Sequence, residues 1–178
     1  EALTERFVQA AAAAKSDPAP LRPKGRPVLK HLFEFACAPD SQLGNSAAFY
    51  GIKHTRLHKD ATDLTDPAVI KQLLKQVKEL GHPVGLWGSI PCTVWSSWQH
   101  MSVKKYGEDY ERKLRVRRAE SMEMFSNFLL IAEAVIANGG TVAFEWPRYC
   151  QGWAQKPLQN FIQKHNLHEA LFDGCEFD

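Results

Sequence analysis

The sequence predicts an α/β fold in which helices cover both faces of a mostly parallel, Rossmann-like sheet. Short apolar runs alternate with segments of helical periodicity along most of the chain. The clearest helix, over residues 65–81, lies between two such runs. Cys92 and Glu145 each follow an apolar run directly, and the carboxyl ends of parallel strands are where α/β proteins place ligand-binding residues.

Two strand and helix pairs are expected at the start of the folded region. The apolar run 28–36 is typical of a buried parallel strand, and residues 39–41 form a turn. A short helix over 43–50 follows and ends at Gly51. Residues 52–58 alternate between apolar and polar side chains, which predicts a strand.

The helix over 65–81 carries a signal at each end. Asp66 is a good N-cap, Pro67 suits the first helical turn, and Gly81 is placed to end the helix. Its apolar side chains recur at helical spacing and form one face for packing: Ile70, Leu73, Leu74, Val77 and Leu80.

The remaining segments continue the alternation. Residues 83–89 predict a strand, and a long helix starts near Asp109 and ends at residues 138–140. Three further elements are expected: a strand over 141–145, a helix over 158–165 and a strand over 169–172. Strands separated by helices in this way predict parallel neighbours with right-handed crossovers.

Length and composition limit the class of protein. The 178 residues fit one domain over 28–178, preceded by a tail or linker over 1–27 that holds a short alanine-rich helix. No apolar run approaches the roughly 20 residues of a membrane span, so we expect a soluble, intracellular protein. The 4 cysteines are widely spread without a CxxC pair, which predicts neither a zinc site nor a disulfide framework.

One segment is distinctly basic. Between Lys104 and Arg118, seven basic residues stand against three acidic ones, although the whole chain has a formal net charge of only +2. This segment suits contact with phosphates and is equally consistent with a solvated helix face. Its candidate nucleic-acid contacts are Arg112, Lys113 and Arg115.

Cys92 and Glu145 are candidate catalytic residues. Pro91 fixes the backbone before Cys92, which suits a nucleophile that must hold one direction. Glu145 has apolar neighbours, whose desolvating effect favours a proton donor near neutral pH. Taken singly, Cys92 also fits a small core residue, and Glu145 fits a structural carboxylate paired with Arg148. Together, a thiol and a carboxylate at two strand ends indicate chemistry on a nucleotide base.

Three motifs follow one another along the chain. They are Phe33-Glu34-Phe35-Ala36-Cys37-Ala38-Pro39-Asp40-Ser41, Ser89-Ile90-Pro91-Cys92-Thr93-Val94-Trp95-Ser96, and Glu145-Trp146-Pro147-Arg148. In this order and at these separations, the chain over about 28–177 resembles the phage-type DNA cytosine-5 methyltransferases. The resemblance implies a class I methyltransferase-like sheet. Trp146 stands at the position of the family's usual asparagine, and Ala38 and Asp40 stand where the family has glycines.

The resemblance implies covalent methylation of carbon five of cytosine in DNA. The base is flipped out of the duplex, the Cys92 thiolate adds to carbon six, and Glu145 hydrogen-bonds or protonates the ring nitrogen. Carbon five then accepts a methyl group from S-adenosylmethionine. Pro91 shapes the catalytic loop and Ser96 orients it beside the DNA, which Arg148 also contacts.

The same resemblance implies a set of cofactor-binding residues. They are Glu34, Ala36, Ala38 and Ser41, with Asp60 or Asp63 for the ribose. Asp63 fits a cap of the following turn equally well. The family's target-recognition domain has no counterpart here, so we expect a fragment or a chain that works with a partner domain or subunit. Its expected location is the cytoplasm of a bacterial or phage host, or a eukaryotic nucleus.

Two other functions fit the sequence. One is a catalytically degenerate member of the same fold that binds nucleic acid or a protein partner. The other is a metal-dependent nuclease with Asp60, Asp63 and Glu145 as ligands. A zinc base deaminase is not indicated, because its Pro-Cys-x-x-Cys and His-x-Glu patterns are missing.

Overall fold

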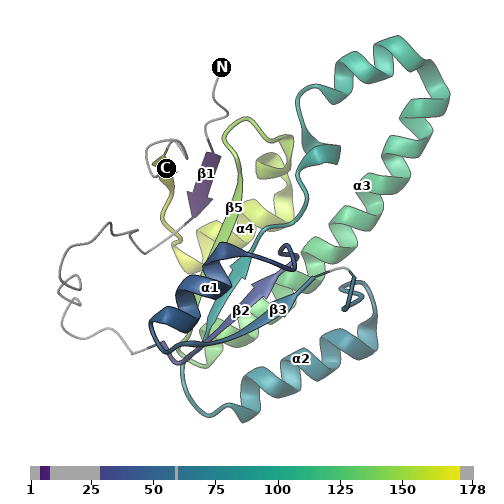
Figure 1. Cartoon of the computed structure of the whole chain (residues 1–178). Helices are drawn as coiled ribbons and strands as arrows, with labels where there is room; N and C mark the ends of the chain where they lie inside the picture. The colour runs from purple at the N-terminus through teal and green to yellow at the C-terminus, as the bar shows by residue number, and fades with distance from the viewer. Residues whose placement is uncertain (1–4, 9–28, 59, 173–178) are drawn as a thin grey trace.

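The computed structural model describes residues 5–8, 29–58 and 60–172, which form a six-stranded sheet in the order β3-β2-β4-β5-β1-β6 (Figure 1). Four adjacent strands are parallel: β3 (Lys53–Leu57), β2 (His31–Phe35), β4 (Gly85–Gly88) and β5 (Thr141–Pro147). This parallel sheet is flanked by helices. The predicted α/β, Rossmann-like fold is therefore confirmed.

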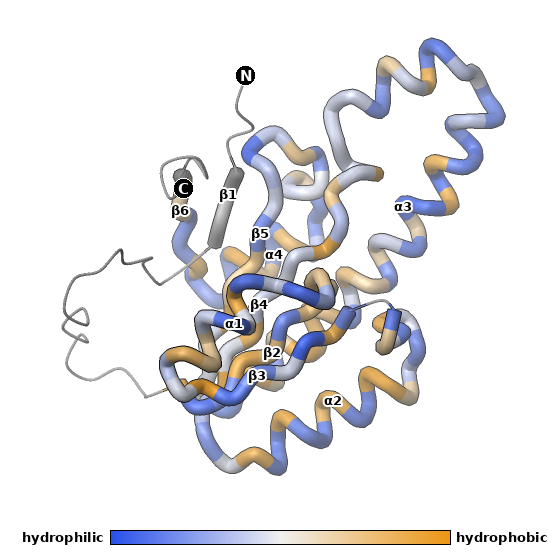
Figure 2. The backbone as a smooth tube through the Cα atoms, viewed as in Figure 1, coloured by the Kyte–Doolittle hydropathy of each residue, from blue (hydrophilic) through white to orange (hydrophobic). Residues whose placement is uncertain are grey.

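The helices lie on both faces of the sheet. α1 (Gln42–Phe49) covers β2 and β3 on one face, and α2 (Pro67–Glu79), α3 (Gln99–Ala137) and α4 (Lys156–His165) pack on the other (Figure 1). α2 begins as predicted, because the Asp66 carboxylate accepts a 2.8 Å hydrogen bond from the Ala68 N–H. The alternating colours along α2 in Figure 2 reflect its one apolar face.

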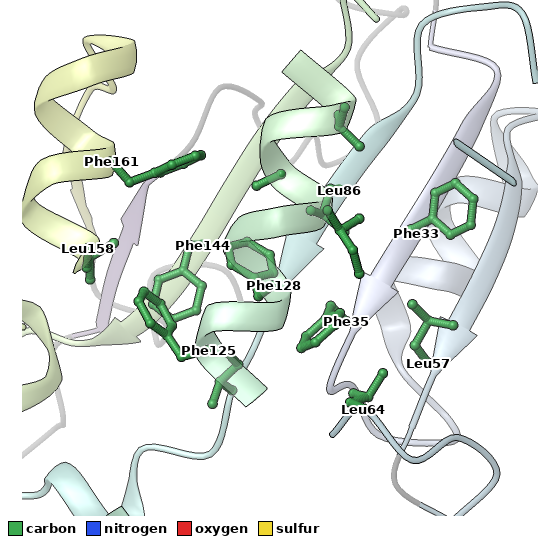
Figure 3. Close-up of a cluster of buried hydrophobic side chains, with 14 of the residues drawn as sticks. Phe33, Phe35, Leu57, Leu64, Leu86, Phe125, Phe128, Phe144, Leu158 and Phe161 are labelled. Carbon is green, nitrogen blue, oxygen red and sulfur yellow. The ribbon is translucent and has the colours of Figure 1, made fainter. Parts of the chain in front are cut away.

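The main core lies between the sheet and α2, α3 and α4 (Figure 3). Phe35 of β2 and Phe144 of β5 point into an aromatic cluster with Phe125 and Phe128 of α3. Gly88 of β4 leaves room for this cluster, since a Cβ there would lie 2.5 Å from the Phe128 ring. Successive side chains of a strand point to opposite faces of the sheet. The residues next to Phe35, Gly88 and Phe144 along their strands therefore point toward the face that carries α1.

α3 begins earlier than predicted. The sequence indicated a start near Asp109, whereas the helix runs from Gln99 and changes direction at Gly107, whose φ of 73° lies in the left-handed region. It therefore has two legs, over residues 99–106 and 108–137. Figure 1 shows the two legs projecting from the sheet as a hairpin.

The edge of the sheet beyond β5 also differs from the prediction. β1 (Glu5–Val8) pairs antiparallel with β5 and with β6 (Ala170–Phe172), although residues 1–27 were expected to form only a tail or linker. The alanine-rich helix expected within 1–27 lies outside the described residues. Among the residues that are described, no helix combines the length and apolar character needed to cross a membrane.

Candidate functional site

The topological switch point of the sheet lies between β2 and β4. The chain passes from β2 outward to β3 and then returns to β4 on the opposite side of β2. The loops that leave β2 and β4 therefore begin side by side, and the Ser89 N–H donates a 3.0 Å hydrogen bond to the Phe35 carbonyl. Open α/β sheets bind ligands in the crevice at such a point. These loops carry the cofactor and nucleophile motifs identified in the sequence.

The loop that carries Cys92 is held on both sides of that residue. The Trp146 indole N–H donates a 2.6 Å hydrogen bond to the carbonyl of Ile90, which is buried. The Trp95 N–H donates a 2.8 Å bond to the Cys92 carbonyl and closes a short 3-10 helix, η1 (Thr93–Trp95). Cys92 itself is half-buried and packs against the core. The backbone on both sides of the Cys92 side chain is therefore held in place.

Glu145 is tied to β4 through a serine that the sequence reasoning gave no role. The Trp87 indole N–H donates to the Ser89 hydroxyl at 3.0 Å, and that hydroxyl donates to Glu145 Oε1 at 2.8 Å. Trp87 and Ser89 are two residues apart in the chain, and this spacing is the only sequence signal that they share a face. The hydrogen-bond chain orients the carboxyl group of Glu145.

Glu145 lies within β5, not beyond its end as the sequence suggested. Pairing with β4 stops at Phe144, but pairing with β1 continues the strand to Pro147 and places Phe7 opposite Glu145. Glu145 and Cys92 thus leave neighbouring parallel strands near the same edge of the sheet.

A second thiol lies near Cys92. Burial, together with repulsion from the nearby Cys92 thiolate, raises the pKa of Cys150 to about 11. Cys150 is therefore protonated at neutral pH and is no base for Cys92. Sequence reasoning missed this proximity, because nothing local in either segment indicates it.

Glu34 and Ser41 are brought together as the cofactor prediction implies, but they serve an internal network. Glu34 is 1% exposed, and its carboxylate accepts a hydrogen bond from the Ser41 hydroxyl. Arg56 Nε lies 3.8 Å from Glu34 Oε2, while Arg56 Nη2 donates to the Ser41 carbonyl at 2.8 Å and to Asn45 Oδ1 at 2.7 Å. Arg56 thereby joins β3 and β2 to α1. Glu34 is closed off by this network.

The loop after β2 presents mainly backbone groups. Ala36 adopts a φ of 61°, a left-handed conformation that favours glycine, and its N–H donates to the Leu57 carbonyl at 2.9 Å. Ala38 is exposed in the same loop. Burial raises the pKa of the Cys37 thiol, and the negative charge of Glu34 adds to the shift.

The two aspartates considered for ribose binding differ in their contacts. Asp60 is exposed, with its carboxylate 4.0 Å from His58 Nδ1. Asp63 accepts hydrogen bonds from the Thr65 hydroxyl at 2.6 Å and the Thr65 N–H at 2.9 Å, which lower its pKa. The cap predicted as one role of Asp63 is therefore confirmed. Over the residues that the structure describes, no three His, Cys, Asp or Glu side chains gather as a metal site would require, so the carboxylate trio of the nuclease hypothesis is not assembled.

The predicted nucleic-acid contacts on α3 are exposed, and two of them have acidic partners on the same helix. Arg112 contacts Asp109 at 2.9 Å, and Arg115 contacts Glu111 at 3.1 Å. Exposed pairs of this kind exchange readily with solvent and hold the side chains only weakly. Lys113 is exposed between them.

The other two predicted contacts lie nearer the sheet. The Ser96 hydroxyl accepts a 3.3 Å hydrogen bond from the Trp98 N–H and so helps to start α3. Arg148 lies over the Tyr149 ring, 5.6 Å from its centroid, and both residues are exposed at the end of β5. Ser96 thus follows the loop that carries Cys92, and Arg148 follows the strand that carries Glu145.

Comparison of the chain with models of known protein families, with curated proteins and with solved structures gave no significant match. The function must therefore be inferred from the side chains of this protein. The most informative are Cys92 on its anchored loop and Glu145 on the neighbouring strand.

Proposed function

We propose that this chain is a catalytic domain that methylates carbon five of cytosine in DNA, with S-adenosylmethionine as methyl donor. The observation that supports this most is the common origin of the Cys92 loop and Glu145 from adjacent parallel strands, beside the switch point. DNA is the proposed partner, and a further domain or subunit would select the target sequence. Such a protein would act inside the cell, where its DNA lies.

Cys92 acts as the nucleophile in this proposal. Its thiolate sulfur forms a bond to carbon six of the cytosine, and the electron pair of the double bond between carbons five and six shifts into the ring. Glu145 hydrogen-bonds or protonates the ring nitrogen, so that negative charge does not accumulate there. The hydrogen bond from Ser89 orients Glu145 for this role, and the bond from Trp146 to Ile90 steadies the Cys92 loop. After carbon five has received the methyl group it loses its proton to water, the double bond between carbons five and six re-forms, and the Cys92 sulfur departs as thiolate.

S-adenosylmethionine, when bound, supplies the methyl group. The chain offers it the main-chain groups of residues 36–38 and the exposed carboxylate of Asp60. Glu34 and Ser41 fit less well, because each is already engaged with the other and with Arg56. Cofactor contacts would therefore come mainly from the backbone of this loop.

Covalent trapping tests the proposal. A duplex that carries 5-fluorocytosine cannot lose the carbon-five substituent as a proton, so the Cys92 adduct should persist and appear as a mass increase on the protein. We expect the adduct with the wild-type chain and S-adenosylmethionine, and with the Cys175→Ala control, which removes another thiol of the chain. The Cys92→Ala variant should form none. An adduct that survives in Cys92→Ala, or no adduct with any chain, contradicts the assignment.

The closed network around Glu34 supports a second candidate, a methyltransferase-like module that binds nucleic acid without catalysis. Glu34 is 1% exposed, and its carboxylate contacts Ser41 and Arg56. Calorimetric titration separates the candidates. Heat on addition of S-adenosylmethionine or S-adenosylhomocysteine favours the enzyme. DNA binding without cofactor binding, unchanged in Cys92→Ala, selects the module.

A further inference from the structure

The two legs of α3 and the preceding turn form a projecting unit, residues 93–121, which we call the hairpin arm (Figure 1). It extends directly from the Cys92 loop. Contacts between its two sides hold it together: the Tyr110 hydroxyl donates to Gln99 Oε1 at 2.8 Å, and Gln99 Nε2 donates to the Thr93 carbonyl at 2.7 Å. The arm is therefore a defined structure and is connected to the candidate nucleophile.

At the base of the hairpin arm, η1 is fixed to the long leg of α3. Arg118 Nε donates to the Val94 carbonyl at 2.9 Å, and the Arg118 guanidinium lies 5.2 Å from the Trp95 ring centroid. The Trp95 indole N–H donates to the Ser121 hydroxyl at 2.9 Å. Arg118 is thus committed to the structure of the arm. The other basic residues of the segment are placed further out.

The shorter leg of the arm carries an exposed apolar and aromatic stripe. Trp98, Met101 and Tyr106 are 66%, 52% and 58% exposed, respectively. Trp98, Met101 and Lys105 follow the spacing i, i+3, i+7, which places them on one side of the leg. Tyr106 is exposed one position further along the leg, and its ring centroid lies 5.7 Å from that of Tyr110 on the long leg. Lys105 Nζ lies 5.0 Å from the Tyr106 ring centroid. Large exposed side chains grouped in this way on one short leg indicate a binding surface.

Both legs of the arm carry exposed basic side chains. Lys104 and Lys105 are exposed on the short leg, and Lys113 and Arg117 are exposed on the long leg. Arg117 lies 5.7 Å from the Tyr110 ring centroid. When the ion pairs of Arg112 and Arg115 are left out, the basic residues of the arm still outnumber its acidic residues. The combination of aromatic faces and positive charge complements a strand with bases and phosphates.

We propose that the stripe on the hairpin arm binds single-stranded nucleic acid, with bases stacked on Trp98 and Tyr106 and phosphates held by Lys104, Lys105, Lys113 and Arg117. A duplex hides its base faces, whereas an unpaired strand presents both bases and phosphates to such a surface. Any reaction of the bound strand at Cys92 rests on the proposed function, whereas binding of the strand to the arm does not depend on it. The arm would present unpaired nucleotides to the Cys92 loop from which it extends.

Fluorescence anisotropy with a labelled oligothymidine of about 20 nucleotides, longer than typical single-strand site sizes, tests this inference. The full chain should bind this strand more tightly than a duplex of the same length. Trp98→Ala and Tyr106→Ala should each weaken binding about fivefold or more, since each removes a stacking face. Lys104→Glu with Lys105→Glu should weaken it and lower the slope of log affinity against log salt by roughly 0.7 for each phosphate that the protein no longer neutralises.

Matched controls lie elsewhere on the surface. Phe49→Ala and Tyr50→Ala remove exposed aromatic side chains at the end of α1, and Lys71→Glu with Lys78→Glu makes the same charge change on α2. All of these variants should keep the affinity for the single strand within about twofold of the wild-type value, when affinities are compared at the same salt concentration and corrected for the change in net charge. Thermal melts check that every variant is folded, and Tyr106→Ala provides a second test if Trp98→Ala is not.

Several outcomes would overturn the inference. They are equal weakening by the arm and control variants, preference for the duplex, or failure to bind the oligothymidine. Binding only to anionic phospholipid vesicles would assign the stripe to a membrane surface instead. Failure of covalent trapping with intact single-strand binding would remove the proposed function and leave this inference standing. If a Cys92 adduct forms and the arm variants bind the single strand as the wild type does, the proposed function stands and this inference is overturned.

Discussion

The Trp146 indole N–H donates a 2.6 Å hydrogen bond to the Ile90 carbonyl, and both residues are 2% exposed. This bond joins β5 to the loop that carries Cys92. Trp146 also packs against Phe144 and Trp153 in the aromatic core. The Trp146 side chain therefore lies in the core and supports the Cys92 loop through its bond to Ile90.

Trp146→Phe should loosen the Cys92 loop. The change leaves the buried Ile90 carbonyl without its donor, which should lower the free energy of unfolding by about 1–3 kcal/mol. Alkylation of Cys92 by iodoacetamide, followed by peptide mass spectrometry, should become faster under native conditions. Trp153→Phe is the matched control, because Trp153 donates to Pro147 instead. It should lower stability while Cys92 reactivity stays at the wild-type rate, and equal acceleration in both variants would contradict this role of Trp146.

Gly44→Ala should be strongly destabilising. A Cβ at Gly44 would lie 2.6 Å from Glu34 Oε2 and 2.8 Å from Arg56 Nε, so α1 would have to move off the sheet or the buried ion pair would have to separate. We expect a loss of about 2–3 kcal/mol in urea unfolding, in the range of overpacked cores. Ser46→Ala, at an exposed position of the same helix, should change stability little. Similar stability of the two variants would show that the contact at Gly44 is not tight.

Ala36→Gly should respond differently from Ala38→Gly. At Ala36 the φ of 61° disfavours any Cβ, so glycine relieves roughly 1–2 kcal/mol of strain and loses part of that gain through greater freedom of the unfolded chain. Ala38 does not share this conformation, so glycine there relieves no strain. The greater freedom of the unfolded chain should then lower the stability by about 0.4–1 kcal/mol. Chemical denaturation should therefore rank Ala36→Gly at least about 1 kcal/mol above Ala38→Gly in stability. The opposite ranking would remove the argument from strain.

Local signals in the sequence predicted the parallel sheet and α2, because apolar runs, the Asp66 cap and Gly81 act within a few residues. The first leg of α3 was missed for the opposite reason. Its helix depends on contacts from outside the leg, such as the bond from Gln99 to the Thr93 carbonyl and that from Tyr110 to Gln99. The periodicity of apolar residues in the sequence does not predict such contacts, so it did not indicate this leg of the helix.

The candidate site was predicted in part. The positions of Cys92 and Glu145 near one edge of the sheet follow from topology, which the alternation of elements indicates. The engagement of Glu34 follows from register, since Glu34 and Arg56 are direct partners on neighbouring strands. Register is set by the whole sheet, so a single sequence contains no local signal for it.

His31 is a buried histidine on β2. It is 8% exposed, its Nε2 lies 2.8 Å from the Thr55 hydroxyl, and its ring stacks on Phe33. Its Nδ1 has no hydrogen-bond partner within the described residues. Burial lowers the pKa of His31, and the nearby positive charges of His82, Lys53 and His54 lower it further.

Stability should therefore fall as the pH falls through the range in which His31 titrates. The unfolded chain takes up a proton at His31 near its ordinary pKa of about 6.5, above the pKa in the folded state, so acid favours unfolding. The free energy of unfolding should decrease from about pH 7.5 to about pH 5.5, by at most about 1.4 kcal/mol per pH unit from this residue. His31→Gln should flatten the slope. Glu133→Gln should leave it intact, because the hydrogen bonds from Lys164 and His165 lower the pKa of Glu133 and its effect appears only at more acidic pH. A slope that persists in His31→Gln would assign the pH dependence to another group.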